Sequence, residues 1–217
     1  MPSRGWNAGE KKRAMNDQYY TREPESASRP VECAFAWRGK SLRFTTDAGV
    51  FSRGELDAGT RLLMDALPET PEGEVLDLGC GWGPIGVSLK SVYPAARVTL
   101  ADVNLRALEW SRRNAARNGA EVECVESDGF SALGGRMFDL IVTNPPIRAG
   151  KAVVYRMLSE AEEHLKPGGR LFLVIRKQQG AESCIKYLKT KFASVEKRDR
   201  SGGFWVLEAR KAGAEEA

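Results

Sequence analysis

The sequence has little histidine and no closely spaced pair of cysteines. His164 is the only histidine among the 217 residues, which argues against a histidine-based catalytic triad and against a multi-histidine metal site. The four cysteines lie far apart without a CxxC pair, so neither a zinc ribbon nor a disulfide framework is indicated, and we expect reduced thiols and no metal. These are Cys33, Cys80, Cys124 and Cys184.

Long apolar runs and an N-terminal signal are also missing. No segment approaches the roughly 18 apolar residues that a membrane-spanning helix needs, and residues 1–20 are polar with mixed charge. We therefore expect a cytoplasmic protein without membrane contact. The net charge of +4 is compatible with nucleic acid but too small to indicate it. Basic clusters at 11–13, 176–177 and 197–200 can touch phosphates, although such clusters usually form solvated faces.

The length suits one domain with a sizeable core. Residues 1–30 combine glycine, proline, serine and charge without periodicity, which predicts a flexible or loosely docked arm. We place the folded domain at 31–210 and a short tail at 211–217. Within that domain, a hairpin and helix at 31–70 precede the core at 71–210.

Two patterns occur before the core. Apolar residues on both sides of a central Arg-Gly-Lys predict a hairpin with strands at 33–37 and 42–45. Ser52 and Glu55 have the spacing of a capping box, which predicts a helix that begins there and stops before Pro68.

From Glu74 onward, strand and helix patterns alternate, as in a parallel sheet covered on both faces. A Pro-Gly-Gly turn is predicted at 167–169, and Ser-Gly-Gly at 201–203 predicts a final hairpin. The predicted strands are Glu74–Leu78, Arg97–Asp102, 122–125, Phe138–Thr143, 170–175, 194–200 and 204–209. The predicted helices are Pro84–Val92, one from Asn104 to Asn118, one after Lys151 and one at about 181–192.

This order of elements predicts an α/β fold with a seven-stranded, mostly parallel sheet that ends in an antiparallel hairpin. It resembles the Rossmann-like fold of class I methyltransferases, in which a final antiparallel strand lies beside the parallel ones.

A glycine-rich turn follows the first strand of the core. Gly81, Gly83 and Gly86 match the GxGxxG spacing of a dinucleotide-binding loop, but Asp77 ends the strand that faces this loop. A carboxylate there repels phosphate, whereas it accepts hydrogen bonds from an ammonium group. S-adenosylmethionine carries an ammonium group and no phosphate, so we favour it over a nicotinamide dinucleotide.

Two more acids follow strands of the predicted sheet. Asp102 ends the second strand, where an acid can accept both hydroxyls of a ribose. Asp128 follows the third strand and is placed to accept from an adenine amino group, with Phe130 packed near the ring. An Asp-Gly turn explains Asp128 equally well, and a helix-start acid explains Asp102.

Asn144, Pro145 and Pro146 end the fourth strand and indicate the chemistry. The prolines fix the backbone and lack N–H donors, so acceptors remain. The Asn144 side-chain oxygen and the Pro145 carbonyl can both accept from one planar amino group and free its lone pair for attack. We predict that these three residues are catalytic.

The motifs at 49–52, 56–60, 77–83 and 144–151 resemble those of the bacterial guanine-N2 methyltransferases of small-subunit ribosomal RNA. The resemblance implies the methyl donor S-adenosylmethionine and an rRNA or small-subunit partner. It also implies a cofactor site made of Phe51, Thr60, Asp77, Gly79, Gly81, Asp102, Asp128 and Asn144. The residues expected to bind substrate are Ile147, Arg148, Lys151 and Lys177.

The chain departs from that family in two ways. Longer members have a degenerate half before the catalytic one, and this chain is too short for both, so RNA docking is expected from the N-terminal hairpin, the basic arm or a second copy in a homodimer. Ile147 stands where many relatives have an aromatic residue that stacks on a flipped-out base. An adenine N6 amine and a protein glutamine amide remain alternative targets. A noncatalytic RNA-binding module and a nicotinamide oxidoreductase are alternatives from other classes.

Overall fold

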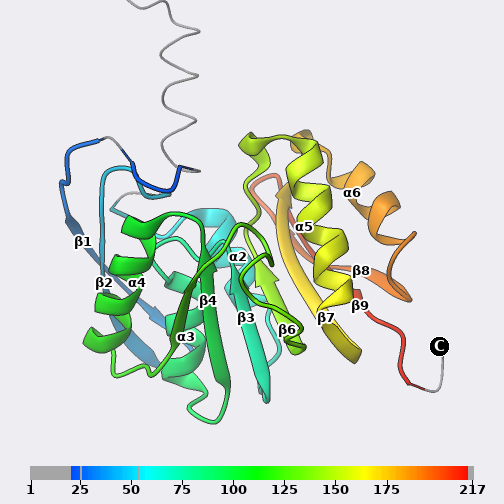
Figure 1. Cartoon of the computed structure of the whole chain (residues 1–217), viewed down its shortest axis with the longest axis horizontal. Coiled ribbons are helices and arrows are strands. Elements are labelled where there is room, and N and C mark those ends of the chain that lie inside the picture. The colour runs from blue at the N-terminus through cyan, green and yellow to red at the C-terminus, as the bar shows by residue number, and fades with distance from the viewer. Residues whose placement is uncertain (1–20, 25, 53, 215–217) are drawn as a thin grey trace, which may run out of the picture.

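The computed structural model describes residues 21–24, 26–52 and 54–214. Seven strands form one sheet in the order β5-β4-β3-β6-β7-β9-β8, and two strands form a separate hairpin (Figure 1). The sheet strands are β3 (Glu74–Leu78), β4 (Arg97–Asp102), β5 (Glu123–Glu126), β6 (Phe138–Thr143), β7 (Leu165–Arg176), β8 (Ser194–Ser201) and β9 (Phe204–Arg210). The predicted α/β fold with a terminal antiparallel hairpin is confirmed.

Strand direction explains where a site forms. Strands β5, β4, β3, β6 and β7 are mutually parallel, so their carboxyl ends meet at one edge of the sheet. Strand β9 runs antiparallel to both β7 and β8. Strand β8 is therefore parallel to β7, and the β8–β9 turn lies at the same edge. We call this edge the carboxyl edge.

Helices cover both faces of the sheet. One face packs against α2 (Ala58–Asp65), α3 (Pro84–Val92) and α4 (Leu105–Arg117), and the other packs against α5 (Lys151–Glu163) and α6 (Ala181–Leu188). Two short 3-10 turns, η1 (Ile147–Ala149) and η2 (Lys177–Gln179), follow β6 and β7 at the carboxyl edge. None of the helices in these described residues is long and apolar enough to cross a membrane.

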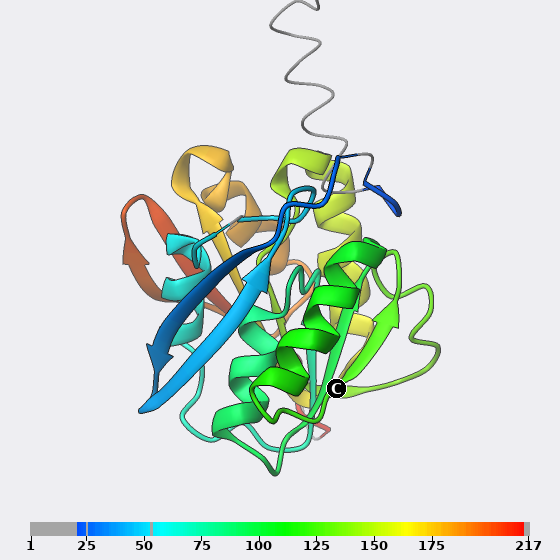
Figure 2. The same ribbon diagram turned by 90° about the vertical axis from the view of Figure 1, so that its left-hand side faces the viewer.

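The N-terminal hairpin has strands β1 (Val31–Trp37) and β2 (Lys40–Thr46), and it packs against α3 and α4 (Figure 2). Arg38 and Gly39 both have positive φ angles, as a two-residue hairpin turn requires. The predicted hairpin is confirmed. The hairpin and the α6–β8–β9 region lie at opposite ends of the molecule (Figure 1).

Most of the predicted arm, residues 1–20, lies outside the described residues. The described part that follows lies against the start of α4. The Leu105 N–H donates to the Arg22 carbonyl at 3.0 Å, and the Arg106 guanidinium donates to the Pro24 and Ser26 carbonyls at 3.0 and 2.7 Å.

The structure corrects the predicted capping box. Helix α2 begins at Ala58, with Asp57 as its N-cap accepting the Thr60 N–H at 3.0 Å. Ser52 has a φ angle of 54°, and its hydroxyl donates to the Glu55 carbonyl. The prediction was wrong because Ser52 and Glu55 close a loop before the helix, and the N-cap is two residues after Glu55.

Two further boundaries differ from prediction. Residues 167–169 form an irregular part of β7, because the register between β6 and β7 shifts between Phe138 and Leu140. A register irregularity can absorb prolines and glycines without a turn. Helix α6 ends at Leu188 rather than near residue 192.

Candidate active site

The loop between β3 and α3 forms one wall of the site. Gly79 and Gly81 have φ angles of 73° and 57°, a conformation that favours glycine. A Cβ at either position would meet no protein atom within 4 Å, so the backbone borders open space. The Gly79 and Cys80 amides donate to the Ala101 carbonyl at 2.8 and 3.0 Å, which ties the loop to β4. The loop therefore presents fixed backbone to a ligand.

Asp77 lies behind this loop rather than in the cavity. Its side chain is buried, with Oδ2 accepting the Gly86 N–H at 2.9 Å. Oδ1 has no hydrogen-bond partner in the described part of the chain. Burial raises the pKa of Asp77 to about 7, while the Gly86 hydrogen bond opposes the shift and the charge of Asp102 adds to it. A buried carboxyl with an unpartnered oxygen is costly, and a bound donor group would lower that cost.

Asp102 ends β4 and faces the cavity. Its Oδ2 accepts the Gly81 N–H at 2.8 Å and its Oδ1 accepts the Asn104 N–H at 2.9 Å. Burial raises the pKa of Asp102, against the effect of these backbone hydrogen bonds. Each oxygen keeps a lone pair. The residue is therefore held rigidly while it can still accept from a ligand hydroxyl.

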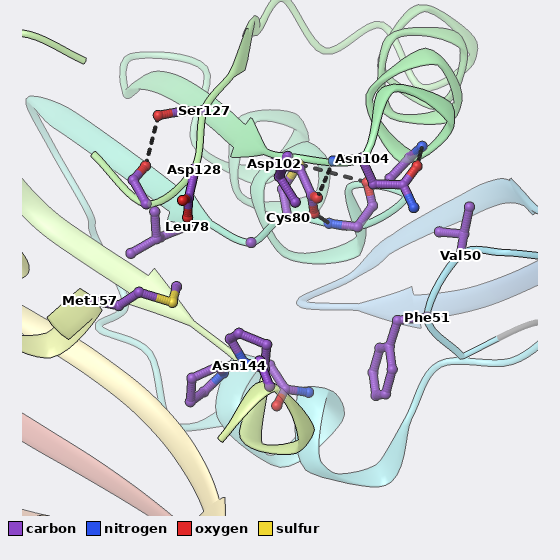
Figure 3. Close-up of a pocket in the computed structure, with 18 of the residues that line it drawn as sticks. Val50, Phe51, Leu78, Cys80, Asp102, Asn104, Ser127, Asp128, Asn144 and Met157 are labelled. Carbon is purple, nitrogen blue, oxygen red and sulfur yellow. Dashed lines mark hydrogen bonds between the residues drawn. The ribbon is translucent and has the colours of Figure 1, made fainter. Parts of the chain in front are cut away.

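These groups border a cavity of about 340 Å³ at the carboxyl edge. Residues at or after the ends of β4 and β5 line one side of the cavity, namely Asp102, Asn104, Ser127 and Asp128 (Figure 3). The other side is lined by Asn144, which follows β6, by Met157 of α5 and by Phe51 in the loop before α2. Most of the residues predicted from the sequence meet here: Phe51, Thr60, Gly79, Gly81, Asp102, Asp128, Asn144, Pro145 and Pro146.

The side chain of Asn144 is oriented by the first turn of α2. Its Nδ2 donates to Thr60 Oγ1 at 2.9 Å and reaches Asp57 Oδ2 at 3.5 Å. Thr60 Oγ1 also lies 3.4 Å from Asp57 Oδ2, so its hydroxyl can donate to the cap residue and accept from Asn144. These contacts use the donor end of the amide. The side-chain oxygen of Asn144 accepts no hydrogen bond from the described residues, so it can accept from a ligand.

The Pro145 carbonyl also has acceptor capacity. It accepts the Ile147 N–H at 2.8 Å across a tight turn in which Pro146 has φ −73° and ψ 71°. A carbonyl oxygen has two lone pairs, so one remains for a second donor. The Asn144 side-chain oxygen and the Pro145 carbonyl thus belong to adjacent residues on the cavity wall.

Asp77 and the predicted substrate residues lie outside the cavity lining. Ile147 packs against the core beneath α5, and Arg148 is exposed on η1. Lys151 extends over the Tyr155 ring, 5.0 Å from its centre. Lys177 is exposed on η2 after β7. These side chains lie around the carboxyl edge rather than within the cavity.

The sequence analysis missed several residues of the site. Asp57 contacts Asn144 without lining the cavity, and although it stands in the motif at 56–60, no local pattern relates it to Asn144, 87 positions away. Arg156 also lines the cavity and pairs with Asp128 at 2.8 Å. Its helical spacing from Val153 and Met157 would have indicated that the three residues share one face of the helix. The remaining missed residues include Val50, Leu78, Cys80, Trp82, Ile85, Asn104 and Ala107.

The sequence matches the family described as methyltransferase small domain over residues 41–208. It is 43% identical over 200 residues to YbxB of Bacillus subtilis, an uncharacterized protein, in a match that covers 91% of this chain and 100% of that one. It is 42% identical over 164 residues to ribosomal RNA small subunit methyltransferase C of Pasteurella multocida, covering 70% of this chain and 50% of that one.

A solved structure is similar as well. It is a 16S rRNA N2 methyltransferase of T. thermophilus in complex with AdoMet and guanosine, with a TM-score of 0.77 and 29% sequence identity. The match covers 87% of this chain and 52% of that one. The chain thus spans about half the length of these two named rRNA methyltransferases.

Proposed function

Because the chain belongs to the methyltransferase small domain family, we propose that it transfers a methyl group from S-adenosylmethionine to the exocyclic N2 amine of a guanine in 16S rRNA. Relatives whose names state this type of reaction support the substrate class. The geometry of Asn144 supports the type of acceptor, which is a planar amino group.

The orientation of Asn144 carries this proposal. An exocyclic amine on a base has its lone pair delocalised into the ring, and two acceptors on its hydrogens draw it toward tetrahedral geometry. The Asn144 amide nitrogen is anchored by Thr60, so its oxygen is available for one hydrogen. The Pro145 carbonyl is available for the other. A protein that only bound RNA would have no use for such a pair.

The residues present fit the proposed methyl donor. Gly79 and Gly81 leave open space where a ligand can touch the backbone. Asp102 is placed to accept from ribose hydroxyls. Burial raises the pKa of Asp102 and Asp77 and so disfavours their charged forms, and a cationic ligand nearby would stabilise those forms. Asp128 is held by Arg156 beside the cavity, where we expect the adenine amino group. The same acids would repel the phosphates of a dinucleotide.

The chain's own residues then have two tasks. S-adenosylmethionine supplies a methyl group on a positively charged sulfur, which needs little further activation. Asn144 and Pro145 hold the acceptor nitrogen in position, and the apolar residues Val50, Ile85 and Met157 limit water at the site. The extra proton on the methylated nitrogen is acidic and leaves to solvent, so no general base is required.

An adenine amine or a glutamine amide would satisfy the same two acceptors. The discriminating experiment incubates the protein with deuterium-labelled methyl donor and, separately, protein-free 16S rRNA, small subunits from a strain that lacks the protein, and a release factor. We expect labelled N2-methylguanosine from one of the ribosomal substrates after nucleoside mass spectrometry. Label in N6-methyladenosine or methylglutamine would replace the proposed target, and no label in any substrate would refute the activity.

A further inference from the structure

Positive charge is concentrated in one stretch of the chain. Between residues 176 and 200 there are eight lysines and arginines against three acids, a net charge of +5, while the whole chain has +4. This stretch runs from the end of β7 through α6 and along β8. The rest of the chain is close to neutral, so the charge that can attract a polyanion belongs to this end of the molecule.

Several of these cations lie over aromatic rings instead of carboxylates. Arg176 lies 4.1 Å from the centre of the Phe204 ring, and Lys197 and Lys177 lie 3.6 and 6.0 Å from the Trp205 ring. Among the described residues, none of these three cations forms an ion pair. A ring orders a cation without neutralising it, which leaves the charge available to a phosphate.

Several arginines at the opposite end of the molecule are paired with acids. Arg97 pairs with Glu74 at 2.5 Å, and Arg113 pairs with Glu109 at 2.8 Å. Further pairs of this kind are Arg22 with Glu126, Arg117 with Glu32 and Arg136 with Glu123. On the β8–β9 hairpin, Arg198 pairs with Glu196 and Glu208 and thereby occupies the acids beside Lys197.

The charged hairpin adjoins the wall of the active site. A Cβ on Gly59 would come within 2.7 Å of the Phe204 ring, so β9 and the first turn of α2 are in close contact. Gly59 precedes Thr60, which orients Asn144. Because β7 and β8 both end at the carboxyl edge, Arg176 and Arg200 lie on the same side of the sheet as the cavity.

We propose that Arg176, Lys177, Lys197 and Arg200 form a docking surface for the phosphate backbone of the RNA strand next to the target nucleotide. This inference rests on the proposed function, since the rRNA substrate gives the surface its partner. Charge complementarity favours a polyanion, and contact with α2 places a bound strand beside Asn144. The surface lies at the end of β7, on η2 and on the β8–β9 hairpin. The sequence analysis noted basic clusters at 176–177 and 197–200, but of these residues it expected only Lys177 to bind substrate.

The test compares two triple variants of the full chain with equal charge change. One replaces Arg176→Gln, Lys197→Gln and Arg200→Gln, and the control replaces the ion-paired Arg97→Gln, Arg113→Gln and Arg117→Gln on β4 and α4. We expect the first to bind a short single-stranded RNA about tenfold more weakly at physiological salt. The slope of log Kd against log salt should fall by about 2, since each phosphate contact on a single strand contributes about 0.7. The control should change Kd by less than about twofold.

Three readouts separate this inference from the proposed function. The Kd for S-adenosylmethionine should be the same in both variants, which shows that the fold is intact. Equal losses of RNA affinity in the two variants would overturn the docking surface, because only net charge would then matter. Transfer to guanine that is unaffected in the hairpin variant would also overturn it and leave the function in place. RNA binding through the hairpin without any guanine methylation would overturn the function and keep the surface.

Discussion

The two halves of the carboxyl edge carry ionisable groups of opposite sign. At the ends of β3 and β4 lie the carboxyl groups of Asp77 and Asp102, and burial raises the pKa of both, so a cationic ligand nearby would stabilise their charged forms. At the ends of β7 and β8, exposed cations such as Arg176 and Arg200 have no carboxylate partner among the described residues. The first half suits a cationic cofactor and the second suits an anionic RNA. Asn144 directly follows β6, which lies between β3 and β7, where the two halves meet.

The largest expected effect on turnover comes from removing the side-chain amide of Asn144, at the boundary between the two halves. Asn144→Ala deletes the oxygen that accepts from the target amine, so turnover should fall by about 100-fold or more, as for other polar groups that act mainly in the transition state. Single-turnover transfer from radiolabelled donor measures the rate, and calorimetry measures donor affinity. Donor affinity should stay nearly intact. Undiminished turnover would show that the amine is activated by other groups.

A smaller effect is expected from the residue that orients Asn144. Thr60→Val keeps the shape of the side chain but removes the hydroxyl that accepts from Asn144 Nδ2. The amide then loses its preferred orientation, and we expect turnover to fall about tenfold. Thr60→Ser keeps the hydroxyl and serves as the control. If both variants lose turnover equally, packing rather than orientation explains the role of Thr60.

The third prediction concerns stability, and we expect it to have the smallest effect on turnover. The free energy of unfolding should depend on pH through Asp77. Burial raises the pKa of Asp77 to about 7, so the folded state holds this proton more tightly than the unfolded state. The free energy of unfolding without cofactor should therefore fall as pH rises from about 4 through 7, by about 4 kcal/mol from this group.

Asp77→Asn removes that titration and should flatten the fall. Thermal unfolding of the cofactor-free protein across this pH range measures the difference. Asp65→Asn removes one exposed carboxylate from α2 and serves as the matched control. If the unfolding temperature of wild type and of Asp77→Asn depended on pH in the same way, the raised pKa of the buried Asp77 carboxyl would be contradicted.

Local patterns indicated residues in the half of the site where we propose that the cofactor binds. Asp77 and the loop glycine Gly81 are close together in sequence and Asp102 ends the next strand, so these residues followed from pattern, whereas Gly79 followed from the family resemblance. The target half depends on contacts between distant segments, such as Thr60 with Asn144 across 84 positions. The hairpin surface depends on sheet order, because β9 inserts between β7 and β8 and brings Arg176 and Phe204 together. No periodicity encodes these contacts.

A crossed binding measurement shows whether opposite halves of one edge bind ligands of opposite charge. Kd values for S-adenosylmethionine and for RNA are determined for Asp102→Ala and for the Arg176, Lys197 and Arg200 triple variant. We predict that Asp102→Ala weakens only the methyl donor, by about tenfold or more, and that the triple variant weakens only RNA. Loss of both ligands in either variant, or unchanged donor affinity in Asp102→Ala, would contradict the claim.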